Sequence, residues 1–183
     1  MRLPGIAVVV AGMLGGSARA ASEAELRARV EGLLGAYRAV TVAEWGALGP
    51  EASVVLEHVA RDLAALPTRR ARALAALGVV QPAAAGPTIR ELATDGTAPV
   101  VLRSAAVDAA WSVLGPRAQD LLVPLLRDPE AAIRLRSARG LATSGASGCR
   151  AVSAAARTLP SSDPVARTAA SCEGQLRANP PEK

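Results

Sequence analysis

A repeat of 33 residues organises most of this chain of 183 residues. Three columns of like residues recur at this spacing, one apolar (Leu56, Ile89, Leu122), one acidic (Asp62, Asp95, Asp128) and one basic (Arg70, Arg103, Arg136). Self-similarity at such a period is the signature of a protein built from stacked copies of one small unit. Because all three columns keep phase, we expect such a stack, in which each unit covers the apolar side of its neighbour.

Each unit reads as two helices joined by a short turn. Leu121, Leu122, Leu125 and Leu126 form the stripe of an amphipathic first helix. Asp128-Pro129 follows, and this pair suits the end of one helix and the start of the next, which runs to about Ala142. Phe is absent and only three residues are aromatic, so the core must consist of Leu, Val and Ala, a composition that favours closely packed helices.

The third unit resembles a HEAT repeat. Its sequence LLVPLLRDPEAAIRLRSARGLA (121–142) has a Leu-rich first helix, Asp-Pro at the turn and an apolar-Arg pair in the second helix. The resemblance covers about 50–177; the second unit departs by an insertion between Asp95 and Arg103, and the first lacks Asp-Pro. It implies an all-α fold: a right-handed alpha-alpha superhelix, here a short solenoid of about four helical hairpins. It also implies a ladder along the stack, formed by Asp62, Asp95 and Asp128 with arginines.

The repeat also predicts the boundaries of the domain. We expect helical capping residues at 21–48, a repeat domain at 49–177 and a disordered tail at 178–183. The predicted units are 49–81, 82–114, 115–147 and 148–177, and the fourth keeps the apolar register while losing the Asp and Arg columns of the 33-residue step. Terminal units of such stacks are atypical because one side meets water.

The first twenty residues read as a secretory signal peptide. A positive start (Met1-Arg2), an apolar stretch from Leu3 to Gly16 and a small-x-small site at Ala18–Ala20 are its three parts. We therefore expect cleavage near Ala20/Ala21 and a secreted or periplasmic protein without stable membrane insertion. Export makes nucleic acid an improbable partner, although the net charge is +5.

Two cysteines, Cys149 and Cys172, favour a structural disulfide. An even number of cysteines in an exported chain favours pairing. The two residues lie about equally far from the turn near residue 161, so they should be level across the last antiparallel hairpin. A redox pair lacks the CxxC spacing here, and a zinc site would need further ligands.

The sequence offers little for catalysis. His58 is the only histidine, and neither an HExxH metal motif nor a Gly-x-Ser-x-Gly elbow accompanies it. We expect no catalytic residues, no metal and no cofactor, and a small-molecule ligand is not expected either.

Arginines concentrate on the predicted second helices, which line the concave face of HEAT-like stacks. The candidate partner-binding basic face comprises Arg70, Arg103, Arg134, Arg136, Arg139 and Arg167. Such a face would suit an acidic protein segment or an anionic polymer of the envelope. The competing interpretation is that several of these arginines bond within the stack and that the rest reflect a composition rich in Arg.

The leading functional hypothesis is a non-catalytic protein–protein interaction scaffold with an unknown protein partner, since stacks of this kind offer long surfaces and few cavities. The alternative is an enzyme or enzyme-accessory protein, because short bacterial HEAT-like repeats also resemble those of the phycobilin lyase family. A third hypothesis, a DNA-binding role like that of HEAT-like glycosylases, lacks the aromatic side chains needed to hold a flipped base.

Overall fold

A computed structural model describes residues 14–178, and this part of the chain is all α-helical. The helices are α1 (Leu14–Leu34), α2 (Val42–Gly46), α3 (Ala52–Arg61), α4 (Pro67–Val80), α5 (Pro82–Thr94), α6 (Val100–Leu114), α7 (Ala118–Leu125), α8 (Ala131–Ala142), α9 (Ala146–Ala156) and α10 (Pro164–Ala178), with a 3-10 turn η1 (Gly115–Arg117) before α7. The predicted all-α class is therefore confirmed.

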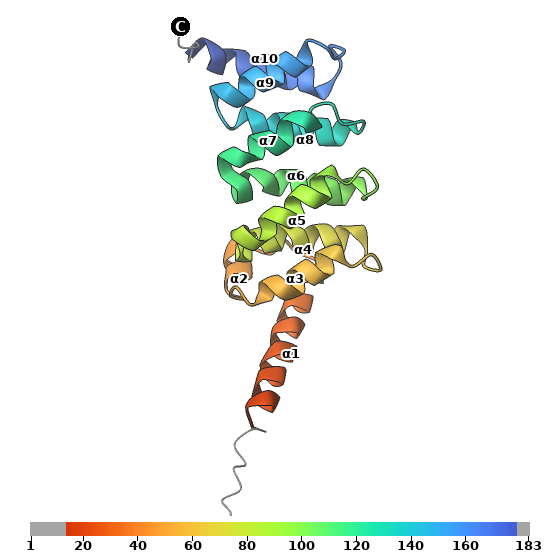
Figure 1. The fold of residues 1–183 in the computed structure, drawn as a ribbon, viewed down its shortest axis with the longest axis vertical. Coiled ribbons are helices and arrows are strands. Elements are labelled where there is room, and N and C mark those ends of the chain that lie inside the picture. The colour runs from red at the N-terminus through yellow and green to blue at the C-terminus, as the bar shows by residue number, and fades with distance from the viewer. Residues whose placement is uncertain (1–13, 179–183) are drawn as a thin grey trace, which may run out of the picture.

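Helices α3 to α10 form four consecutive hairpins. Within each hairpin a first helix (α3, α5, α7 or α9) packs against a second helix (α4, α6, α8 or α10). Each second helix also packs against the second helix of the next hairpin. Figure 1 shows the hairpins one above another along the long axis, with the turns inside the hairpins at one edge.

The core runs through the stack and consists of aliphatic side chains. Its largest fully buried members come from both helices of the first three hairpins: Leu56, Leu74, Leu77, Ile89, Leu102, Leu122, Leu126, Ile133 and Leu141. Alanines lie between them, and Ala73, Ala93, Ala106 and Ala110 have no exposed surface. Small side chains at these places let neighbouring helices approach closely.

The N-terminal helices cover the first hairpin. Thr41 and Glu44 form the predicted capping box of α2: the Thr41 hydroxyl accepts from the Glu44 N–H at 3.2 Å, and the Glu44 carboxylate accepts from the Thr41 N–H at 2.8 Å. The guanidinium of Arg72 on α4 donates to the carbonyls of Leu34 and Ala36 at 2.7 and 2.8 Å. These bonds attach the end of α1 to the stack.

The predicted signal peptide lies largely outside the described residues. Residues 1–13 are not described, and the backbone of residues 14–20 belongs to the first turns of α1. Residues 179–183 of the predicted tail lie outside as well, whereas Ala178 ends α10. Among the described helices, none combines the length and the apolar character that a membrane crossing requires.

The turns inside the hairpins shorten along the chain, and this shifts the register of the second helices. Five residues separate Asp62 from the first residue of α4, as well as Asp95 from that of α6, but Asp128 precedes α8 by only three. Asp163 directly precedes α10. A constant step of 33 residues therefore holds for the first two hairpins and fails in the second helices of the last two.

Cys149 on α9 and Cys172 on α10 form the expected disulfide. Their Cα atoms lie 5.3 Å apart, and both side chains are fully buried. The bridge joins the two helices of the last hairpin, which has no following hairpin packed against it.

Candidate binding surface

The same place in every second helix holds an arginine. The fourth residue is Arg70 in α4, Arg103 in α6, Arg134 in α8 and Arg167 in α10. In each case the backbone N–H makes the first hydrogen bond across four residues, with N···O distances of 3.0 to 3.3 Å. The arginine column of the 33-residue step is thus wrong in the third hairpin, where Arg134 rather than Arg136 is equivalent to Arg70 and Arg103.

These arginines connect consecutive hairpins. Arg103 is 4% exposed and binds both carboxylate oxygens of Asp128 in the next turn, while also donating to the carbonyl of Ala93 at 3.3 Å. Arg134 repeats the contact one hairpin later: its Nε and Nη2 donate to Asp163 at 3.0 and 2.7 Å. Charged groups removed from water in this way need such paired contacts. Asp163 therefore restores the acidic column that the fourth unit lacks at the 33-residue step.

Asp62 and Asp95 have a different role from Asp128. In both, one carboxylate oxygen accepts from the backbone N–H two residues further on, at 2.9 Å. Within residues 14–178 neither carboxylate forms an ion pair with an arginine. The interhairpin ladder thus includes Asp128, whereas Asp62 and Asp95 stabilise their own turns.

Arg70, Arg103 and Arg134 do not belong to an exposed basic face, contrary to the expectation from sequence. Arg70 is 6% exposed and donates to the carbonyl of Ala60 at 3.0 Å. Arg103 is buried against Asp128, and the side chain of Arg134 is mostly covered by its contacts with Asp163. The reason is steric and electrostatic: the fourth residue of a second helix points to the next hairpin, where a carboxylate or carbonyl receives it.

Arg136, Arg139 and Arg167 are the candidates that lie exposed. Arg136 on α8 forms an ion pair with Asp108 on α6, with both side chains about half exposed. Arg139 and Arg167 form no ion pair within the described part of the chain, and Arg167 donates only to the carbonyl of Ser162, at 3.4 Å. The exposed basic surface is thus confined to α8 and α10.

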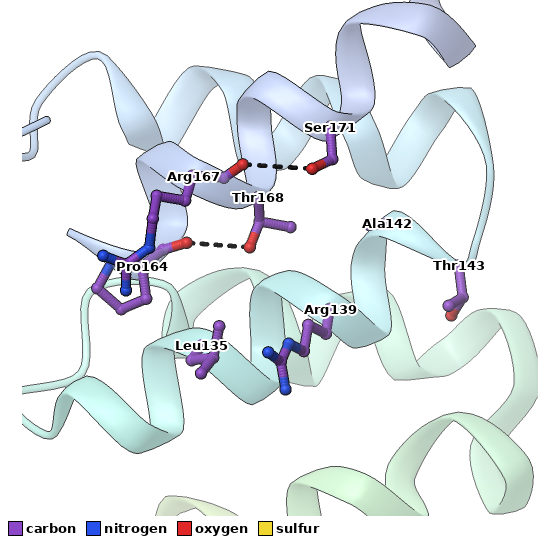
Figure 2. Close-up of a pocket in the computed structure, with 8 residues that line it drawn as sticks. All are labelled: Leu135, Arg139, Ala142, Thr143, Pro164, Arg167, Thr168 and Ser171. Atoms are coloured by element: carbon purple, nitrogen blue, oxygen red, sulfur yellow. Dashed lines mark hydrogen bonds between the residues drawn. The ribbon is translucent and has the colours of Figure 1, made fainter. Parts of the chain in front are cut away.

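Arg139 and Arg167 line the same open groove between α8 and α10, shown in Figure 2. Its volume is about 570 Å³, and the other lining residues are Leu135, Ala142, Thr143, Pro164, Thr168 and Ser171. The hydroxyls of Thr168 and Ser171 donate to the backbone of their own helix, to Pro164 and Arg167 (Figure 2). Guanidinium groups are therefore the main hydrogen-bond donors left to a ligand in this groove.

The electrostatics of the adjoining turn favour ionised carboxylates. Burial opposes the ionisation of Asp163, but hydrogen bonds from Arg134 and from the N–H of Val165 outweigh it and hold the pKa of Asp163 below its ordinary value. The charge of Arg167 acts in the same direction. A carboxylate brought into this region by a partner would likewise meet a positive potential.

Other candidate chemistry is not assembled around this groove. His58 lies exposed on α3, in the first hairpin. Across residues 14–178, no three His, Cys, Asp or Glu side chains are grouped so that they could hold a metal ion.

A polar network between α3 and α5 was not anticipated from the sequence. Arg61 donates to Glu57 and Glu91, and to the hydroxyl of the fully buried Thr88 at 3.0 Å. Thr88 in turn donates to Glu57 at 2.9 Å. The spacing of Glu57 and Arg61 on one helix face was the only available signal, because the contact with α5 depends on how the hairpins stack.

Comparison with known proteins gives no match: no protein-family model, no curated protein and no solved structure is similar to this chain. The function must therefore be inferred from the residues and their arrangement.

Proposed function

We propose that this chain is an exported, non-catalytic scaffold for protein–protein interaction, built as a short right-handed superhelix of HEAT-like hairpins. The observation that carries the proposal is the open groove between α8 and α10, in which Arg139 and Arg167 remain available to a partner. The ladder contacts Arg103–Asp128 and Arg134–Asp163 support a rigid stack, on which such a surface would keep its shape.

Export rests on the leader-like sequence at residues 1–20 and agrees with the disulfide. Disulfides persist in oxidising compartments such as a periplasm or the extracellular space. The scaffold would work there with a protein partner, and the exposed arginines favour an acidic one.

The proposal is tested by chemical crosslinking in the intact cell envelope, followed by affinity purification and mass spectrometry. The tagged chain should be recovered with Ala21 as its first residue and with a reproducible protein partner. The charge-reversed variant R136E/R139E/R167E should lose that partner, whereas the matched variant R127E/R150E/R157E, altered at exposed arginines elsewhere, should keep it.

Two results would count against the scaffold. One is recovery of the chain without any protein partner, and the other is a pigment or other small molecule bound to the purified protein. The second result would favour the enzyme-accessory role instead.

A further inference from the structure

Equivalent positions in the four hairpins are neutralised everywhere except in the groove between α8 and α10. The fourth residue of the second helix shows this first. Arg103 and Arg134 bind the aspartate of the following turn, and Arg70 is buried against a carbonyl. No hairpin follows α10, so Arg167 has no such aspartate and lies exposed at the groove.

The ninth residue of the second helix shows the same change. It is Ala75 in α4, Asp108 in α6 and Arg139 in α8. Asp108 faces Arg136 of the neighbouring helix and pairs with it. Arg139 acts electrostatically on Asp108 as well, but this carboxylate is already bound to Arg136. Across the groove, α10 offers Arg139 only hydroxyl and apolar side chains besides Arg167.

The apolar part of the groove adds a second requirement. Leu135, Ala142 and Pro164 line it between and beside the two arginines (Figure 2). A ligand that fills it must therefore offer aliphatic surface as well as negative charge. A planar guanidinium binds a carboxylate through two parallel hydrogen bonds, so two arginines suit two carboxylates.

We infer that this groove binds an extended acidic peptide segment of the partner protein, with carboxylates at Arg139 and Arg167 and an aliphatic side chain against Leu135. This inference rests on the proposed scaffold function and names the site and the chemistry of the ligand. A peptide that alternates acidic and aliphatic residues meets both requirements, whereas a polyphosphate meets only the first.

Fluorescence anisotropy with a labelled hexapeptide, Glu-Leu-Glu-Glu-Leu-Glu, tests the inference on the full mature chain with its disulfide intact. The wild type should bind this probe, and binding should weaken as salt is added, because exposed ion pairs are screened. Binding of the uncharged counterpart Gln-Leu-Gln-Gln-Leu-Gln should be at least about tenfold weaker.

Three variants locate the site. R139A/R167A should weaken binding about tenfold or more, and R139K/R167K should bind with intermediate affinity because it keeps the charge and loses the two-bond geometry. R150A/R157A removes the same charge from exposed positions on α9 and should bind as the wild type does. The thermal unfolding midpoint of each variant checks that the fold is retained, which is expected because all four side chains are exposed.

Equal losses in R139A/R167A and R150A/R157A would overturn the inference, since they would show general charge attraction rather than a groove. Stronger binding of hexaglutamate or inorganic polyphosphate than of the probe would overturn the peptide assignment. If R139A/R167A still captures the crosslinked partner of the wild type, the groove is excluded while the scaffold proposal stands. If the wild type has no partner at all, the scaffold proposal itself fails.

Discussion

The fourth residue of each second helix links one hairpin to the next. Its guanidinium leaves its own helix and reaches the turn of the following hairpin, so a single arginine connects two units. Arg103 does this from a buried position, where its charge must be matched by Asp128. The contribution of this pair to stability therefore depends on both members being present.

Replacing Asp128 with Asn should destabilise the stack. The change keeps the shape of the side chain but leaves the buried Arg103 without a countercharge, a loss typically of about 3–5 kcal/mol. Urea unfolding followed by circular dichroism measures it. The control is Asp62→Asn, which changes a carboxylate that accepts only a turn N–H and should cost less than about 1 kcal/mol. Equal losses in the two variants would show that the buried pair adds nothing beyond a turn contact.

Acidification should weaken the contact between α8 and the last turn. The pKa of Asp163 is lowered in the folded chain, so its contribution to stability is complete above the pKa of an unfolded Asp, about 3.9. It is lost as the pH falls through the lower folded value. Asp163→Asn should therefore be less stable than the wild type at about pH 6, and the difference should shrink towards about pH 2. Unfolding curves across this range check it, and a difference independent of pH would contradict it.

At the scale of helices, close approach depends on small residues. Gly148 at the start of α9 lies against the end of α8, and a Cβ at this position would collide with the carbonyl of Leu141 and the hydroxyl of Ser144. This carbonyl belongs to the backbone and cannot move away without displacing α8. Gly148 thus sets how tightly α9 follows α8.

Gly148→Ala should lower the free energy of unfolding by at least about 2 kcal/mol, because the added methyl group forces the two helices apart. Gly174→Ala is the matched control: a Cβ there meets no atom within 4 Å, and Ala favours a helix over Gly by up to about 1 kcal/mol. Chemical denaturation of the two variants should therefore give changes of opposite sign. Stabilisation by both substitutions would contradict the packing between α8 and α9.

The last hairpin depends on its disulfide. Cys149 and Cys172 are 23 residues apart, and a loop of that length is worth about 3.5 kcal/mol in the chain-entropy account. In C149A/C172A, hydrogen exchange should become faster first in α9 and α10, while α3 to α6 keep their protection, since stacked hairpins contact only their neighbours. A uniform loss of protection along the chain would instead indicate that the stack unfolds as one unit.

At the scale of the whole molecule, the sequence predicted the hairpins better than the contacts between them. Apolar spacing and Asp-Pro placed α7 and α8, and symmetry about the last turn paired Cys149 with Cys172. The step of 33 residues aligned Arg136 with Arg103, but two residues are missing from the third turn, so Arg134 occupies the equivalent place. Turn length is set by local geometry, which a constant period does not reveal.

The candidate surface was predicted only in part, for a related reason. Six arginines share a basic column or lie near it, yet burial separates Arg70 and Arg103 from Arg139 and Arg167. Whether an arginine is free depends on a carboxylate about 25 to 29 residues away along the chain, as in Arg103–Asp128 and Arg134–Asp163. Such distant pairs follow from the stacking of hairpins and from no local pattern.

The central claim is that the chain holds a protein partner on the face formed by α8 and α10. Photocrosslinking in the native cell envelope tests it most directly, with a benzophenone amino acid placed either at position 168, in the groove, or at position 123, on the exposed surface of α7. We predict a covalent adduct to one protein from position 168 and none from position 123. No adduct from position 168, or the same adducts from both positions, would contradict the account.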